Sequence, residues 1–351
     1  MMLQGHFIDT LLAIEYRDPD NIAYSTWLYF RGITAPVFFT ISGLIFTYLL
    51  IKAKEKGTLS IRIRKGLVRG LMLIGIGYAL RIPIFRWLTG KFGTYFMVID
   101  VLQCIGLSLI LIVCIYLLAR KKTLIFSVVM LCLGTLIFLC EPLFRTYSAE
   151  RIPLFFANYL TKVNGSVFTI LPWFGYMAYG AFIATLFYGY LTRPKFKTGL
   201  ITGFFVTGLI LVYGSTPVFL ELAKLINWTL LTEVANFNYL FIRLGNVLVI
   251  FGLFYVFEDY LKQPVVLIIG QKTLSIYVIH FILLYGSFTG LGLNQILGKV
   301  LTPFEVVFGA ICFLVTVSLI SIYIIKANTH IYKYIIDKLH YLKSLTKSLN
   351  N

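Results

Sequence analysis

The chain has little charge and very little acid. Only 13% of its 351 residues are charged, and only 14 are Asp or Glu, whereas a soluble domain carries about 25% charged residues. That composition excludes a water-soluble globular fold. The five cysteines show neither a metal-ligand spacing nor a disulfide framework, so we expect no metal centre.

Several enzyme signatures are also missing. The sequence has no Gly-rich phosphate loop, no His-Glu-x-x-His zinc helix and no Gly-x-Ser-x-Gly elbow, which excludes the motif-defined enzymes of those three kinds. It has no repeat, low-complexity linker or soluble domain. We therefore predict one membrane domain over residues 1–326, followed by a basic amphipathic tail over residues 327–351 that lies on the cytoplasmic surface.

Long apolar runs fill most of the chain, which is 59% hydrophobic with a mean hydropathy of +0.88. A helix needs about 20 apolar residues to cross a hydrocarbon core of about 30 Å. Backbone groups inside lipid require a helix or a closed barrel, and runs that do not alternate favour helices. We predict an all-α bundle of about ten transmembrane helices, over residues 1–14, 28–51, 66–85, 97–119, 122–140, 167–190, 198–219, 239–257, 264–287 and 303–326.

Basic residues give the bundle a direction. With ten spans, most of the 31 Lys and Arg residues fall on one side of the membrane, and the positive-inside rule makes that side cytoplasmic. Both termini are then cytoplasmic, in a bacterial inner membrane. The net charge of +17 is explained by topology and by attraction to anionic lipid headgroups, so no nucleic-acid partner is required.

The first predicted span is unusually short. Only 14 residues precede Glu15, and a helix of that length covers about 21 Å, less than the hydrocarbon core. We expect either a partial span or a natural N-terminus upstream of Met1.

A few polar residues fall inside the apolar runs. Burying a charge at the bilayer centre costs roughly 2.5–3.5 kcal/mol or more, so each such residue suggests a function. With the predicted orientation, nearly all of them lie in the outer half of the membrane, and we expect them to line one pocket that opens away from the cytoplasm. The residues are His6, Asp9, Arg31, Arg81, Asp100, Gln103, Arg243, Asn246 and His280.

His6 and Asp9 are the candidate catalytic residues. They are three positions apart and share a helix face. A carboxylate beside an imidazole fixes its tautomer and raises its basicity, so the pair could take a proton from an acceptor hydroxyl or amine. The alternative is a buried histidine satisfied by a neighbouring helix.

The remaining polar residues are candidates for binding substrate or a developing oxyanion. Arg31 could bind an anionic group or pair with Asp100, and Gln103 shares a helix face with Asp100. Arg243 could stabilise an oxyanion, and His280 follows a helix start rich in small and hydroxyl residues. The alternatives are snorkelling of the arginines to the interface and helix packing at His280.

Five stretches resemble the bacterial relatives of heparan-α-glucosaminide N-acetyltransferase. They are residues 2–9 (MLQGHFID), 31–36 (RGITAP), 100–106 (DVLQCIG), 171–175 (LPWFG) and 270–280 (GQKTLSIYVIH). The resemblance implies ten or eleven helices and transfer of an acyl group from cytoplasmic acyl-CoA to a sugar beyond the membrane. It makes His6 the acyl-transfer histidine, as base or acyl carrier. The family's Arg…Asp…Arg-Gly stretch ahead of the histidine is absent here.

Acyl-CoA, with acetyl-CoA expected, is therefore the predicted co-substrate, and a sugar or glycan is the predicted acceptor. The phosphates of acyl-CoA could bind the basic loop over residues 52–69, which contains Arg62, Arg64 and Lys65. The bilayer is the other partner, and the sequence leaves the oligomeric state open, with a homo-oligomer among the options.

Two rival interpretations stay open. Outer-half polar groups and a helix bent at Pro36 also suit a transporter or flippase for a small polar or glycan-linked substrate. The sequence shows no paired broken helices in corresponding halves, as an inverted-repeat carrier would. A membrane scaffold protein is the second rival, and it would need no histidine–carboxylate pair inside the bilayer.

Overall fold

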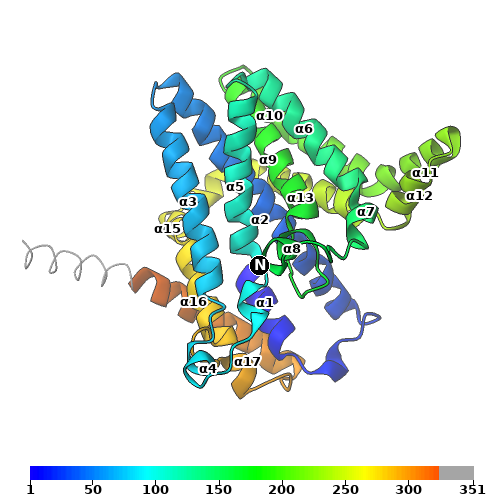
Figure 1. The fold of residues 1–351 in the computed structure, drawn as a ribbon. Helices are drawn as coiled ribbons and strands as arrows, with labels where there is room; N and C mark the ends of the chain where they lie inside the picture. The colour runs from blue at the N-terminus through cyan, green and yellow to red at the C-terminus, as the bar shows by residue number, and fades with distance from the viewer. Residues whose placement is uncertain (324–351) are drawn as a thin grey trace, which may run out of the picture. The chain divides into compact units, whose positions relative to one another are not determined.

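The computed structural model describes residues 1–323, and all regular elements within them are helices (Figure 1). One isolated β-bridge joins Leu12 and Leu301. The predicted all-α class is therefore confirmed for this part of the chain. The tail predicted over residues 327–351 lies outside the described residues. The chain divides into two compact units, one made of Asp20–Glu258 and one that joins Met1–Pro19 to the residues from Asp259 onward.

The larger unit is a bundle of long helices with short helices between them. Its elements are α2 (Ile22–Glu55), α3 (Leu59–Ala79), α4 (Ile84–Leu88), η2 (Thr94–Met97), α5 (Val101–Leu118), α6 (Thr123–Leu139), α7 (Glu141–Arg145), α8 (Leu154–Leu160), α9 (Ile170–Tyr190), α10 (Phe196–Leu209), the π-helical η3 (Ile210–Gly214), α11 (Ser215–Ile226), α12 (Thr229–Asn236) and α13 (Tyr239–Val256).

The smaller unit combines the start of the chain with its later part. Its elements are α1 (Met2–Leu11), η1 (Ile14–Tyr16), α15 (Pro264–Gln271), α16 (Thr273–Tyr285), α17 (Leu293–Ile296) and the helix Pro303–Tyr323, while the short α14 (Glu258–Leu261) stands at the boundary between the units. Residues 11–13 run beside Leu301: the N–H of Ala13 donates to the Leu301 carbonyl, and the N–H of Leu301 donates to the Leu11 carbonyl, both at 3.0 Å.

Six helical stretches of residues 1–323 are long and apolar enough to cross a membrane, or seven if α15 and α16 form one span. The six are α2, Thr94–Leu118, α9, Phe196–Ile226, α13 and Pro303–Tyr323. α6 is apolar but has 17 residues, and the ten-residue α1 covers only about 15 Å. The predicted count of ten spans and the cytoplasmic termini are not confirmed and stay predictions.

The span predicted over residues 264–287 is wrong as a single straight helix. It breaks at Lys272 into α15 and α16, which are bent by 65° relative to each other. Gly270, Gln271, Lys272 and Thr273 lie at the break, but the apolar residues on both sides made the stretch resemble one continuous span. The span predicted over residues 198–219 is longer than expected, because the π-helical η3 joins α10 to α11 in one stretch.

Glycines let the long helices of the larger unit approach closely. A Cβ placed on Gly70 of α3 would lie 2.7 Å from the carbonyl oxygen of Gly106 on α5, and one on Gly106 would lie 2.5 Å from that of Gly70. Gly208 of α10 and Gly245 of α13 meet in the same reciprocal way, at 2.8 and 2.6 Å. Such small-residue contacts are how helices pack when lipid leaves no hydrophobic driving force between them.

Candidate active site

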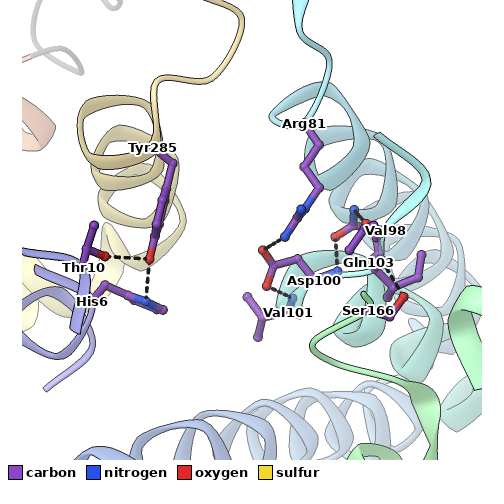
Figure 2. Close-up of polar contacts among 10 residues, drawn as sticks. His6, Thr10, Arg81, Val98, Asp100, Val101, Gln103, Ser166 and Tyr285 are labelled. Atoms are coloured by element: carbon purple, nitrogen blue, oxygen red, sulfur yellow. Dashed lines mark hydrogen bonds and ion pairs between the residues drawn. The ribbon is translucent and has the colours of Figure 1, made fainter. Parts of the chain in front are cut away.

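His6 lies on α1 and contacts the end of α16. Its Nδ1 is 3.1 Å from the hydroxyl of Tyr285, the last residue of α16 (Figure 2). Thr10, one helical turn after His6, donates its hydroxyl to the same Tyr285 oxygen at 3.4 Å. Three side chains from two helices therefore share one hydrogen-bonded group in the smaller unit.

His280 stacks on His6. The two ring centroids are 5.3 Å apart with an interplanar angle of 25°, and His280 is fully buried. Its Nδ1 lies 3.3 Å from the carbonyl oxygen of Ile276, and because a carbonyl can only accept, this nitrogen donates. In the neutral ring Nε2 is then the acceptor nitrogen. The structure thus brings together two of the predicted site residues, His6 and His280.

Asp9 forms an ion pair that sequence spacing did not suggest. Its carboxylate lies 3.9 Å from Nη1 of Arg17, just beyond η1. Nη2 of Arg17 also donates to the backbone carbonyls of Asp9 and Leu12, each at 2.8 Å. Arg17 therefore caps the C-terminal end of α1 by hydrogen-bonding its last carbonyls. The predicted pairing of Asp9 with His6 stays a prediction.

Aromatic packing fixes α1 in the smaller unit. Phe7 is buried and packs against Phe313 of the helix Pro303–Tyr323, with ring centroids 5.1 Å apart. Gly309 makes room for this contact, since a Cβ there would lie 2.9 Å from the Phe7 ring. Because Phe7 follows His6 directly, this packing sets the rotation of α1 that turns His6 toward Tyr285.

Asp100 and Gln103 have a defined structural role in the larger unit. Asp100 is the N-cap of α5, and its Oδ1 accepts from the N–H of Val101 at 2.8 Å. The Gln103 side chain completes a capping box by accepting from the N–H of Asp100 at 3.2 Å (Figure 2). Such a box satisfies N–H groups that the first turn of a helix otherwise leaves unpaired.

Arg81 binds the other oxygen of the same carboxylate. Its Nη2 lies 2.8 Å from Oδ2 of Asp100, and the side chains are only 7% and 16% exposed. The guanidinium also lies over the ring of Tyr95, 5.1 Å from its centroid. The N–H of Ile99, the residue before Asp100, donates to the Ser166 hydroxyl at 3.1 Å. Asp100 thus joins the end of α3 to the start of α5.

Arg31 and Arg243 lie against aromatic rings. Arg31 is 5.7 Å from the ring centroid of Trp27, and Arg243 is 5.3 Å from that of Tyr239. The Arg243 guanidinium also packs on Gly32, where a Cβ would lie 3.0 Å from Nη2. The Arg243 side chain therefore packs against α2 at Gly32, where a larger residue would crowd the guanidinium.

The predicted phosphate-binding cations are on α3. Arg64 and Lys65 are exposed in its first two turns, and Arg62 lies over the ring of Phe46, 5.7 Å from its centroid. Within residues 1–323, no three His, Cys, Asp or Glu side chains are placed to hold a metal ion.

Sequence reasoning also missed the ion pair between Glu141 and Arg145. Glu141 is buried at the start of α7 and binds Arg145 through both carboxylate oxygens, at 3.1 and 2.5 Å. Arg145 also lies over the ring of Phe237, 4.4 Å from its centroid. The hydrogen bond to Glu141 raises the pKa of the Arg145 guanidinium. The i, i+4 spacing of the two residues was the signal that could have revealed the pair.

The structure therefore forms two polar groups from the predicted residues. His6 and His280 meet in the smaller unit, together with Tyr285 and Thr10. Asp100 and Gln103 meet in the larger unit, together with Arg81. The convergence of all these residues on one pocket stays a prediction.

Comparison with known protein families matches residues 1–220 to the family described as heparan-alpha-glucosaminide N-acetyltransferase, catalytic. No curated protein and no solved structure matches the chain. The matched region covers more than half of the 351 residues and includes His6, Arg31, Asp100 and Gln103. Four of the five stretches that carry the resemblance lie within the matched residues, whereas residues 270–280 lie outside them. The resemblance to the family is confirmed, and the chain belongs to the family of the heparan-alpha-glucosaminide N-acetyltransferase catalytic domain.

Proposed function

We propose that the protein is a membrane acyltransferase that moves an acetyl group from cytoplasmic acetyl-CoA to an amine or hydroxyl of a sugar on the other side of the membrane. The proposal rests chiefly on His6. This histidine lies in the family-matched region, hydrogen-bonds Tyr285 and stacks on His280. The family name and the six apolar spans support the same conclusion.

His6 can serve as a general base in one of its two tautomers. The Tyr285 oxygen already accepts from Thr10, and it can also accept from Nδ1–H of His6. The lone pair then lies on Nε2, which takes a proton from the sugar amine or hydroxyl. Tyr285 in this arrangement holds the ring orientation and stabilises the imidazolium formed in the step.

The reaction balances without any further reactant. The sugar nitrogen or oxygen attacks the thioester carbonyl, and the proton that it loses passes to Nε2 of His6. When the tetrahedral intermediate collapses, the C–S bond breaks and His6 returns the proton to the departing CoA thiolate. Negative charge on the carbonyl oxygen needs cations nearby, and Arg31 and Arg243 are the residues that the sequence predicts for this role.

Binding of acetyl-CoA would use the other cations. Arg64 and Lys65 are exposed near the start of α3, and Arg62 completes the group. Arginine forks and lysine ammonium groups are the usual ligands of phosphate oxygens. We assign the CoA phosphates to this end of α3, which the predicted topology makes cytoplasmic.

One observation favours a transporter as the second candidate. α15 and α16 form a broken span with a bend of 65°, and discontinuous helices are typical of substrate sites in carriers. A transporter would move a labelled sugar across a liposome membrane without acetylating it.

The test is acetyl transfer by the purified full chain in liposomes, with radiolabelled acetyl-CoA and a glucosamine-containing oligosaccharide as acceptor. Because a general base contributes roughly 10²–10⁴-fold to rate, His6→Ala should lower the transfer rate by about that factor. His340→Ala, in the predicted tail, is the matched control and should behave as wild type. Transfer at the wild-type rate by a folded His6→Ala protein would disprove the assignment.

A further inference from the structure

A large apolar cavity lies between α6, α9, α10 and α13 of the larger unit. Its volume is about 610 Å³, within the range of roughly 300–1,000 Å³ that is usual for ligand sites. None of its lining residues is charged. Two of its few polar groups, the hydroxyls of Thr135 and Tyr179, are hydrogen-bonded to each other at 2.9 Å. The cavity therefore suits an apolar group, such as a hydrocarbon chain, of a ligand.

The cavity opens along one face of α10. Gly199, Gly203 and Thr207 line it at intervals of four residues, and all three are exposed. A Cβ placed on Gly199 or Gly203 would meet no atom within 4 Å. These glycines leave open the space that side chains would fill on an ordinary helix. Because α10 belongs to a candidate membrane span whose apolar window is only 17% buried, this face is turned toward lipid.

The cavity has the length of one membrane leaflet. Its lining on α9 runs from Tyr179 to Tyr190, and eleven steps of a helix cover about 16 Å. Half of a hydrocarbon core of about 30 Å is nearly the same length. A lipid chain from a single leaflet could thus lie along α9 for most of its depth.

One end of the cavity is basic. Tyr190 and Phe196 line this end, and the loop between them carries Arg193 and Lys195, both exposed. The Arg193 guanidinium lies over the Tyr190 ring, 4.7 Å from its centroid. Cations at the membrane surface attract anionic lipid headgroups.

The geometry points to a binding site for an anionic phospholipid of the surrounding bilayer. One acyl chain lies in the cavity between α9 and α10, and the phosphate binds Arg193 and Lys195. The charge of the loop and the apolar lining together select this occupant over a neutral lipid or a second copy of the chain. The site does not depend on the proposed acyl transfer.

The experiment is native mass spectrometry of the full-length protein, titrated with phosphatidylglycerol or with phosphatidylcholine of identical acyl chains. Phosphatidylglycerol should bind about tenfold tighter or more, because two cations contact its headgroup. Arg193→Gln with Lys195→Gln should abolish that preference. Gly199→Leu with Gly203→Leu adds side chains to the cavity at positions where a Cβ meets no atom within 4 Å, and it should weaken binding of both lipids about tenfold.

Two control variants separate loss of lipid binding at this site from the general effects of adding a leucine or removing two cations elsewhere. Gly75→Leu adds the same side chain to an exposed helical glycine of α3 that also has nothing within 4 Å. Arg120→Gln with Lys121→Gln removes two cations from the loop between α5 and α6. Both controls should bind lipid as wild type does.

The site would be wrong if the loop variant or the cavity-filling variant bound lipid with the same affinity as its control variant. It would also be wrong if the wild-type protein bound phosphatidylglycerol and phosphatidylcholine equally. If the cavity-filling variant changed oligomeric state but bound lipid normally, the α10 face would be an interface with a second copy of the protein, and the lipid site would be wrong. The loop variant alters only exposed side chains, so it keeps the proposal testable if the cavity-filling pair fails to fold.

Discussion

The hydroxyl of Tyr285 is the most informative single group beside His6. It lies 3.1 Å from Nδ1 and also accepts from Thr10. A histidine that acts as a base needs one nitrogen engaged so that the other keeps its lone pair. Tyr285 is therefore a positioning residue in the proposed reaction, and it acts through His6 rather than on the substrate.

Replacing Tyr285 with Phe keeps the ring and removes the oxygen. We expect kcat for acetyl transfer to fall by about tenfold to a hundredfold, the loss seen when the partner of a metal-bound histidine is removed. The KM for the acceptor should stay unchanged, because a residue that acts only through His6 does not contact the sugar. Steady-state kinetics of the liposome assay measure both, with the exposed Tyr260→Phe as control. A higher KM at constant kcat would instead make Tyr285 a binding residue.

The sequence could suggest His6 and His280 but not how they are held. A histidine inside an apolar run is unusual enough to be noticed, whereas Tyr285 is one of 23 tyrosines in the chain. Its contact with His6 joins residues 279 positions apart, so it depends on how α1 packs on α16. The ion pair of Asp9 with Arg17 similarly depends on the turn after α1, which spacing rules along a helix do not describe.

At the scale of elements, the start of α5 shows how one carboxylate can serve two helices. Asp100 caps α5 with one oxygen and binds Arg81, at the end of α3, with the other. The pair is mostly buried, and removing one partner from a buried pair is strongly destabilising. This role competes with the substrate-binding role that the sequence suggested for Asp100.

Two substitutions at Asp100 separate its roles. Asn keeps a cap acceptor but loses the charge, whereas Ala loses both, so we expect Asp100→Ala to be less stable than Asp100→Asn by about 1 kcal/mol. Both should be less stable than wild type, because the ion pair with Arg81 is gone. Thermal unfolding of the purified protein in detergent measures this. Wild-type stability in both variants, with acetyl transfer lost, would make Asp100 a substrate-binding residue instead.

Long apolar helices could be predicted closely from the sequence. α6 and α13 begin and end within one residue of the expected limits, 122–140 and 239–257. α2 begins six residues earlier than residue 28, because Asn21 caps it by accepting from the N–H groups of Ala23 and Tyr24. The break between α15 and α16 coincides with Gly270, Gln271 and Lys272, but these residues do not determine the bend of 65°, which depends on tertiary packing.

For the whole molecule, the number of membrane crossings depends on α3. α3 has 21 residues and covers about 31 Å, enough for the hydrocarbon core, yet it is not among the six candidate spans of residues 1–323. Its basic residues, Arg62, Arg64, Lys65 and Arg69, all lie within its first eleven residues. Long cationic side chains at one end of a span can reach the interface. The predicted topology therefore requires α3 to cross.

This requirement can be tested by cysteine labelling in intact cells and in lysed cells. Single cysteines replace Lys56, before α3, and Lys91, after it, in a protein whose five native cysteines are changed to Ser. A membrane-impermeant maleimide should label position 91 in intact cells and position 56 only after lysis, because basic loops stay cytoplasmic. Lys121→Cys, in the basic loop between α5 and α6, should behave like position 56. Equal labelling of positions 56 and 91 in intact cells would place both ends of α3 on one side, and the ten-span topology would be wrong.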